Sequence, residues 1–210
     1  GAELRLTPGY EGMKGALNFA KELAKDIKDS FQFNQFENLA NPEIHAKTTA
    51  KEIWEQTNHN LDGLVTGVGT GGTVTGCASY LKKVNPKCKI FAVEPEKSAV
   101  ISGRDPGPHQ IQGIGAGFIP KVLKTDLIDE VLTIQDEDAF YFGRVLAKVE
   151  GLLSGISSGA ALAATIQIGK RKEFQNKRII VILPSFGERY LSTAMFDANT
   201  SIQARKDGYL

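Results

Sequence analysis

The ten residues GVGTGGTVTG, at positions 67–76, contain five glycines and three threonines and carry the clearest chemical signal in the chain. They follow the apolar pair Leu64-Val65 and precede a segment with helical periodicity, so they are predicted to join a buried strand to a helix. Glycines let backbone N–H groups approach an anion closely, and a helix N-terminus adds positive potential. Because Thr70 and Thr73 can add hydroxyl donors, the pattern favours a phosphate site.

Two alternatives to this phosphate site stay open on the segment alone. One is a tight turn between strand and helix that binds no ligand. The other is a dinucleotide site, because Gly67, Gly69 and Gly72 fit the spacing G-x-G-x-x-G and Glu94 stands at the end of the next predicted strand, where an acid would bind the ribose. A nucleotide P-loop is excluded, since no lysine follows the glycines.

The elements that must position this segment alternate between strand and helix. Strands are predicted in SFQFNQF (30–36), DGLVTGV (62–68), KIFAVEP (89–95), EVLTI (130–134) and RIIVILP (178–184). Helices are predicted over 13–27 with one face inward, 47–56 after a turn at NPEIH, 73–84, 136–151 with Asp136 as N-cap, and from Ser158 onward. The continuous apolar strands indicate an α/β fold, with a parallel sheet covered by helices on both faces.

The bulk composition excludes several classes of function. The formal net charge is +1, which gives no electrostatic basis for binding nucleic acid or an anionic membrane, and no run approaches 18 apolar residues. Cys77 and Cys88 have neither CxxC spacing nor nearby histidines, so no metal site is expected. The length favours one large domain, or one domain plus a piece of another.

Four further stretches identify a family. They are NQFENLANPEIHAKTTAKEIW (34–54), GPHQIQGIGAGFIP (107–120), GLLSGISSGAA (151–161) and ILPSFGERYLST (182–193). Together with the glycine-rich segment they resemble cysteine synthase (O-acetylserine sulfhydrylase), of the fold-type-II pyridoxal-phosphate enzymes, from Gly1 to about Phe196. The resemblance implies an open, mostly parallel three-layer α/β/α sheet of the tryptophan synthase β type, with a remnant of a smaller domain (1–33), a larger cofactor domain (34–196) and a peripheral tail (197–210).

The resemblance also assigns site residues for the cofactor, pyridoxal 5′-phosphate. Its phosphate would be held by Gly69, Thr70, Gly71, Gly72 and Thr73. The hydroxyl of Ser157 would bond the pyridine nitrogen, and Ser185 would lie near the ring. These assignments displace the dinucleotide alternative.

On the substrate side, the resemblance implies that Gln35 contacts the substrate carboxylate and that Gly113 lines the substrate entrance. His45 and His109 also recur in the matching stretches, but no chemical role is assigned to them. The reaction implied is replacement of the acetate of O-acetyl-L-serine by sulfide, through an aminoacrylate intermediate, to give L-cysteine. A cystathionine β-synthase type of replacement is the alternative.

Two features of the family are missing from the sequence. The family's lysine, which forms a Schiff base with the cofactor, lies in an SVKDR-like stretch, and an SGNTG-like loop contacts cofactor and substrate; this chain contains neither. We therefore expect a C-terminal portion of a cysteine synthase, with no catalytic residue of its own and no activity alone.

Partners follow from the same resemblance. A homodimer in the cytoplasm is expected. In the other interpretation, the chain is a catalytically dead relative that binds the C-terminal tail of serine acetyltransferase around Gly113–Phe118.

Overall fold

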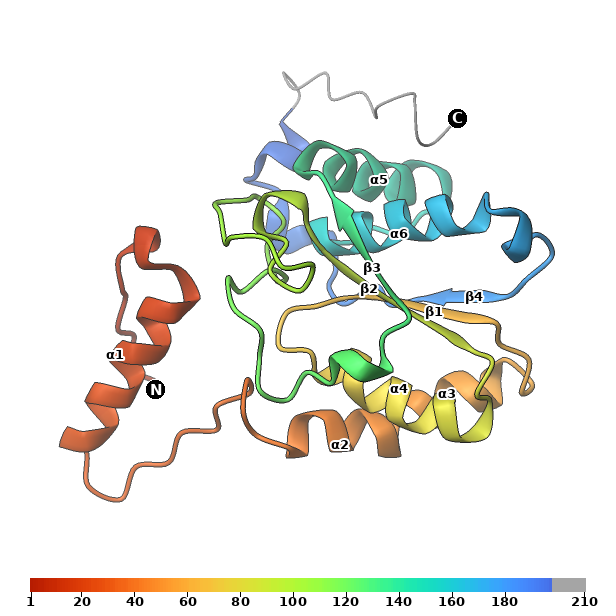
Figure 1. The fold of residues 1–210 in the computed structure, drawn as a ribbon. Helices are drawn as coiled ribbons and strands as arrows, with labels where there is room; N and C mark the ends of the chain where they lie inside the picture. Colours follow the sequence, from red (N-terminus) through yellow and green to blue (C-terminus); the bar gives the residue numbers. More distant parts are fainter. Residues whose placement is uncertain (198–210) are drawn as a thin grey trace.

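The computed structural model describes residues 1–197, and a four-stranded parallel sheet forms its centre (Figure 1). The strands are β1 (Gly63–Gly67), β2 (Lys89–Pro95), β3 (Glu130–Ile134) and β4 (Ile179–Val181), in the order β3-β2-β1-β4. The α-helices are α1 (Gly12–Asp26), α2 (Ala40–Lys47), α3 (Thr49–Gln56), α4 (Gly72–Val84), α5 (Asp136–Val149) and α6 (Ile156–Gly169). Short 3₁₀ helices stand at Gly9–Glu11, Glu96–Ser98, Thr125–Leu127, Lys172–Phe174, Gly187–Tyr190 and Ala194–Phe196.

The helices cover the sheet on both faces, which confirms the predicted three-layer α/β/α architecture. In Figure 1, α5 and α6 lie above the sheet, and α2, α3 and α4 lie below it. Side chains alternate between these layers, because successive strand residues point to opposite faces. Leu64 packs in one apolar cluster with Leu81 of α4, whereas its neighbour Val65 packs in the other with Phe140 of α5 and Ile168 of α6.

The order of the strands creates a change of direction beside β1. From β1 the chain moves to β2 and then β3, and afterwards returns to place β4 on the opposite side of β1. Gly63 of β1 pairs with Lys89 of β2 on one side and with Ile179 of β4 on the other. Ligands of open α/β sheets bind beyond the carboxyl ends of the strands at such a point. The loops that follow β1 and β4 are therefore the favoured place for a site.

Close packing between α5 and α6 depends on small residues. A Cβ on Gly159 of α6 would overlap the Ala139 carbonyl of α5 and lie 2.5 Å from the Gly143 nitrogen. The two helices can therefore approach backbone to backbone, which fixes where α6 begins. The start of α6 carries Ser157 and Ser158, both fully buried.

Four predictions about local structure were wrong. Residues 30–36 form no strand, since no neighbouring strand pairs with them, and NPEIH is helical rather than a turn, because Pro42 occupies the first turn of α2, where its missing N–H is tolerated. RIIVILP contributes only the three half-buried residues of β4, which pair with β1 on one side alone. Asp136 is the first residue of α5 and makes no capping bond; its carboxylate instead binds Lys97 and the Gln110 N–H.

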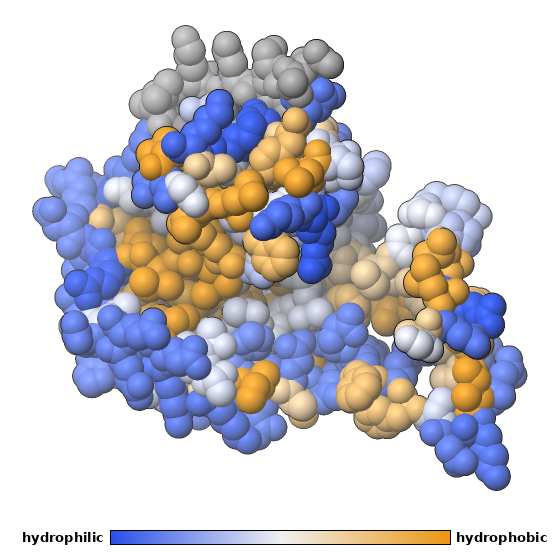
Figure 2. Space-filling view, turned by 180° about the vertical axis from the view of Figure 1, so that it is seen from behind, coloured by the Kyte–Doolittle hydropathy of each residue, from blue (hydrophilic) through white to orange (hydrophobic). Residues whose placement is uncertain are grey.

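The N-terminal arm, residues 1–33, projects from the rest of the molecule (Figure 1). Helix α1 lies within one residue of the predicted bounds but has no buried residue, and the face expected to point inward is only half-buried, at Ala16, Leu17, Ala20, Leu23 and Ala24. Large apolar side chains along the arm are exposed, among them Leu4, Leu6, Tyr10, Phe31 and Phe33. The space-filling view shows the arm as a mixture of apolar and hydrophilic surface (Figure 2).

In the part of the chain that the structure describes, no helix combines the length and apolar character needed to cross a membrane.

Truncation of the sheet centre is expected to cost far more stability than truncation of the arm. Ile90, in the central strand β2, is fully buried, whereas Leu6 is 82% exposed. We expect Ile90→Ala to lower the free energy of unfolding by about 2–5 kcal/mol, through lost transfer energy and a residual cavity. Leu6→Ala should change it by less than about 0.5 kcal/mol. Urea unfolding of both variants measures this difference, and equal losses would contradict the packing described here.

Candidate functional site

The glycine loop, residues 67–73, lies where the strand order predicts a site. It leaves the carboxyl end of β1 and enters α4 at Gly72. Gly71 is the residue before the helix and has φ +83°, a left-handed conformation that favours glycine. The N–H groups of the first turn of α4 have no partners within the helix, so this end of α4 can receive an anion.

The loop carrying Gly113 packs directly against the glycine loop. The Gly115 N–H donates to the Val68 carbonyl at 3.1 Å. A Cβ on Gly69 would overlap the Gly113 carbonyl, and a Cβ on Gly67 would lie 2.8 Å from Ile114. Gly113, Gly115 and Gly117 all have positive φ. The two loops therefore touch through bare backbone, and side chains at Gly67 or Gly69 would separate them.

Ser157 lies on the other side of Gly113. A Cβ on Gly113 would be 3.7 Å from the Ser157 Oγ, so the serine at the start of α6 faces the same loop as Gly69. Ser157 is 3% exposed, and its hydroxyl has no hydrogen-bond partner among residues 1–197. Neither Ser157 nor Ser158 caps α6, because the N-cap is Gly155 and the Ser158 hydroxyl donates to the Ser185 carbonyl at 3.5 Å.

Ser185 follows β4 and lies beside the start of α6. Its carbonyl accepts a hydrogen bond from the Gly155 N–H at 2.8 Å, and its hydroxyl lies 3.1 Å from the Tyr190 hydroxyl. This side chain is therefore already paired, unlike that of Ser157. The structure places Ser185 at the predicted end of the sheet, where its carbonyl binds the Gly155 N–H and the Ser158 hydroxyl at the start of α6.

Gln35 reaches the glycine loop through an intermediate residue. The Asn41 side-chain amide donates to the Gln35 carbonyl at 2.8 Å and to the Thr70 hydroxyl at 3.0 Å. The Gln35 side chain itself is exposed. The structure thus brings Gln35, Thr70 and Gly113 to one end of the sheet, although they are far apart in the sequence.

Helix α2 contributes two residues that sequence analysis left without a role. Asn41 binds Thr70, and the ring of His45 lies with Nε2 3.3 Å from the Thr73 hydroxyl and Nδ1 2.9 Å from the Thr49 hydroxyl. Burial lowers the pKa of His45. The signal was present in NPEIH, since Asn41 and His45 are four positions apart and share a helical face, but the segment was interpreted as a turn.

The threonines of the glycine-rich segment divide into two groups. Thr70 and Thr73 are half-buried and face α2, whereas Thr75 is buried and accepts a hydrogen bond from the Lys124 N–H at 3.0 Å. Thr75 therefore fixes a neighbouring loop, and only Thr70 and Thr73 remain as hydroxyls for a ligand.

Two polar clusters hold the Gly113 loop in place. His109 Nδ1 accepts from the Ile111 N–H at 3.2 Å, so its Nε2 carries the proton and donates to the Gly115 carbonyl at 3.0 Å. Behind it, the buried carboxylate of Asp136 binds Lys97 at 2.7 Å and the Gln110 N–H at 3.0 Å. Both histidines of the family stretches thus act as structural partners of site loops.

Glu94 is unavailable for the ribose contact of a dinucleotide site. It is buried, and its carboxylate accepts hydrogen bonds from the N–H groups of Ile101 and Ser102, both at 2.9 Å, and from the Ser102 hydroxyl at 2.6 Å. These three donors occupy the acid in closing the turn after β2. The structure therefore removes one of the two observations on which the dinucleotide alternative depended, and only the glycine spacing remains.

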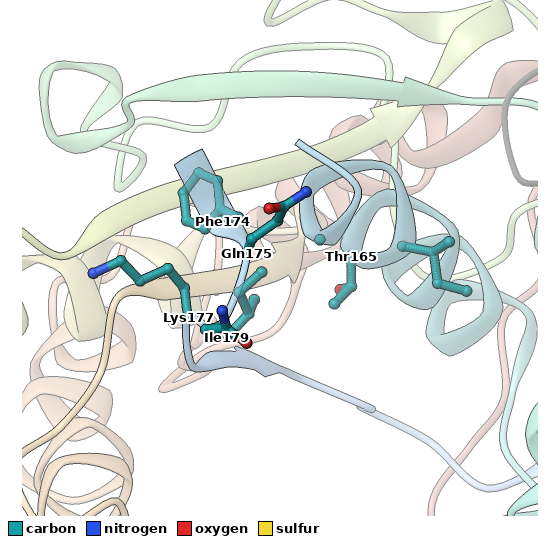
Figure 3. A pocket seen from close by; sticks show the side chains of 8 residues that line it. Thr165, Phe174, Gln175, Lys177 and Ile179 are labelled. Carbon is teal, nitrogen blue, oxygen red and sulfur yellow. The ribbon is translucent and has the colours of Figure 1, made fainter. Parts of the chain in front are cut away.

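A hollow of about 690 Å³ lies at the opposite end of the sheet (Figure 3). It is bordered by Thr165 of α6, by Phe174 and Gln175 of the following loop and by Ile179 at the start of β4. Lys177 beside it pairs with Asp62 at 3.1 Å. The one charged residue that lines the hollow, Lys177, is thus already paired, and the glycine loop remains the better candidate site.

Substitution of Gly69 is expected to destabilise the junction of the two loops. A methyl group at Gly69 has no room beside the Gly113 carbonyl, so Gly69→Ala should lower the free energy of unfolding by about 1–3 kcal/mol. Gly169→Ala is the matched control, because nothing lies within 4 Å of the new methyl there. Equal urea midpoints for the two variants would contradict the contact.

The stability of the chain is expected to fall in acid partly through His45. Because burial lowers its folded-state pKa below the unfolded value of about 6.5, the unfolded chain binds the proton more readily. The contribution of His45 to the free energy of unfolding is therefore complete above about pH 6.5 and is lost as the pH falls through the pKa of His45 in the folded state. Between pH 8 and 5, we expect the free energy of unfolding measured with urea to decline less for His45→Asn than for the wild type. His59→Asn, at an exposed histidine, is the control and should decline like the wild type. Parallel declines would contradict the expectation.

Comparisons with known proteins identify the family of this chain. The family model described as pyridoxal-phosphate dependent enzyme matches residues 1–185. A cysteine synthase of Buchnera aphidicola is 53% identical over 205 residues, covering 93% of this chain and 65% of that protein. The chain thus spans somewhat less than two thirds of the length of this curated relative.

Solved structures match the whole architecture. A cysteine synthase of Entamoeba histolytica superposes with a TM-score of 0.90 at 44% identity, covering 97% of this chain and 60% of that one. An O-acetylserine dependent cystathionine beta-synthase of Helicobacter pylori gives a TM-score of 0.86 at 43% identity, covering 90% of this chain and 61% of that one. The parallel sheet, the glycine loop at its direction change and the family match together show that the chain belongs to the pyridoxal-phosphate dependent enzymes.

Proposed function

We propose that the glycine loop binds the phosphate of pyridoxal 5′-phosphate, through Gly69, Thr70, Gly71, Gly72 and Thr73. The observation that supports this most directly is the meeting of three segments at one end of the sheet. The bare backbone of Gly69, the Gly113 loop and the hydroxyl of the buried residue Ser157 all face the same place.

The residues present suit a phosphate monoester. Its oxygens only accept hydrogen bonds at neutral pH, and the loop offers backbone N–H groups at the start of α4 together with the hydroxyls of Thr70 and Thr73. Gly71 and Gly72 leave the backbone uncovered where the anion would approach. A Cβ on Gly71 would lie 2.9 Å from Leu123, so only glycine fits there.

Ser157 is proposed to bond the pyridine nitrogen of the cofactor. The bound cofactor supplies an electron sink for the substrate carbanion. A serine hydroxyl donates a hydrogen bond to that nitrogen but is too weak an acid to give up its proton. Ser157 would thus orient the ring and moderate its electron demand, which favours elimination over side reactions. Ser185, paired with Tyr190, would support this end of the site from behind.

Substrate contacts are proposed for Gln35 and Gly113. The Gln35 backbone carbonyl is tied to Thr70 through Asn41, and the Gln35 side chain is exposed, so its amide would be free to bind a carboxylate held beside the phosphate loop. Gly113, with φ +96°, presents backbone to the same space and would line the substrate entrance. Catalysis would need the Schiff-base lysine of the family, for which this sequence offers no matching stretch.

For the whole protein we propose cysteine synthase activity, in which sulfide replaces the acetate of O-acetyl-L-serine. The names of the Buchnera aphidicola and Entamoeba histolytica relatives support this assignment. The Helicobacter pylori relative keeps a cystathionine β-synthase type of replacement as a second candidate. Residues 1–33 would belong to a smaller domain and residues 34–196 to the cofactor domain. The proposed tail is 197–210, and all of it after residue 197 lies outside the described residues.

The proposed setting is a homodimer in the cytoplasm. The loop from Gly113 to Phe118 borders the site and is at least partly exposed over most of its length, so it is also the proposed contact for a serine acetyltransferase tail.

The function is tested by completing the chain with the front segment of the Buchnera aphidicola relative. We expect this chimera to bind pyridoxal phosphate and to form cysteine from O-acetylserine and sulfide. The chain alone should form none. Offering homocysteine in place of sulfide separates the two candidate activities. A chimera that folds and binds the cofactor, yet uses neither nucleophile, would refute the assignment.

Ser157 is expected to matter for turnover more than its neighbour does. In the chimera, Ser157→Ala should lower kcat by at least about tenfold, because the ring nitrogen loses its hydrogen-bond partner. Ser158→Ala is the matched control, since its hydroxyl bonds the Ser185 carbonyl. Steady-state kinetics of both variants measures the difference, and equal kcat values would argue against a direct role for Ser157.

A further inference from the structure

Asn41 connects two parts of the site through one amide group. Its Nδ2 donates to the Gln35 carbonyl at 2.8 Å and to Thr70 Oγ1 at 3.0 Å. The carbonyl can only accept, so the nitrogen of the amide must face it, and the orientation of the side chain follows. The same nitrogen then supplies the hydrogen for the bond to Thr70.

This arrangement fixes the direction in which the Thr70 hydroxyl can act. Its oxygen accepts from the Asn41 amide and also from the Gly72 N–H at 3.3 Å. A hydroxyl has two acceptor lone pairs and one donor hydrogen, so both lone pairs are used. What remains is the O–H hydrogen, which is free to donate to a ligand. Thr70 is therefore prepared as a donor and not as an acceptor.

Helix α2 can place Asn41 there because α4 has no side chains at the contact. A Cβ on Gly72 would overlap the Asn41 amide, and a Cβ on Gly76, one turn later, would overlap the Pro42 carbonyl. The glycines at these two positions let the start of α2 pack directly against the backbone of α4. Asn41 is itself half-buried within this contact, so its amide is held in place on several sides.

We propose that Asn41 is a positioning residue that commits the Thr70 hydroxyl to donate to the bound phosphate group, and that ties the Gln35 segment to the phosphate loop. The inference rests on the proposed function, in which the glycine loop holds a phosphate monoester. A donor-only hydroxyl favours a ligand whose oxygens only accept, and the phosphate dianion is such a ligand. Asn41 touches no ligand itself and acts through Thr70.

The test measures binding of pyridoxine 5′-phosphate to the chain by calorimetry. This probe has the ring and the phosphate but no aldehyde, so it forms no Schiff base with surface lysines. We expect Asn41→Ala to weaken its affinity about tenfold, the range of one hydrogen bond to a charged group. Pyridoxine, which lacks the phosphate, should bind the variant and the wild type equally.

A double-mutant cycle separates positioning from general structure. Thr70→Val should weaken binding by a similar factor, and adding Asn41→Ala to it should cause no further loss. In a Thr70→Ser background, which restores the hydroxyl, the effect of Asn41→Ala should return. Asn38→Ala is the matched control: Asn38 bonds the Ala40 N–H and the Phe33 carbonyl near the same helix start and should not change affinity.

The possible outcomes distinguish this inference from the proposed function. A wild-type chain that does not bind pyridoxine 5′-phosphate would refute the phosphate assignment, and the role of Asn41 with it. Normal wild-type binding with an unchanged Asn41→Ala variant, or with additive losses in the cycle, would refute the inference alone. If Asn41→Ala does not fold, Asn41→Asp is used instead, because it keeps the shape of the side chain. A carboxylate can only accept, so the Thr70 hydroxyl would donate to it and no longer to the phosphate. We therefore expect Asn41→Asp to bind the probe more weakly than Asn38→Ala does. Equal binding would overturn the inference.

Discussion

Close approach of bare backbone is the constraint on which the site depends. The glycine loop touches the Gly113 loop at Gly69, and α2 rests on α4 at Gly72 and Gly76. A single Cβ at any of these positions would force apart segments that are distant in sequence. The closeness has a chemical consequence, because it brings N–H groups and hydroxyls to one point without any charged side chain having to be buried there.

The sheet supplies the second requirement, which is a place where these segments can meet. Because β1 lies between β2 and β4, the loops that leave β1 and β4 emerge side by side. The loop after β1 carries the donors for an anion, while the loop after β4 supports the start of α6 through the Ser185 carbonyl. The distance between the glycine loop and Ser157 is thus set by strand order and by the α5–α6 packing at Gly159, rather than by either loop alone.

Most parts of this arrangement that depend on short stretches of sequence were predicted. The parts that depend on contacts between distant residues were not. The parallel strands, α4 and the glycine loop follow from periodicity and glycine spacing within short windows. Residues 30–36 alternate as a strand would, yet no strand lies beside them to pair with. The roles of Asn41 and Glu94 depend on partners brought by the fold, Thr70 for the first and the turn at Ser102 for the second. No pattern in a single sequence reports such pairs.

The proposed contacts of this site involve the cofactor and the amino-acid substrate. In the proposed function, the groups assembled here would bind the phosphate and the ring nitrogen of the cofactor and the carboxylate of the amino-acid substrate. None of these proposed contacts involves the incoming nucleophile. This agrees with the solved relatives, since a cysteine synthase and a cystathionine beta-synthase share this architecture at 44% and 43% identity to the chain. Choice of nucleophile must therefore depend on smaller differences around a common cofactor site.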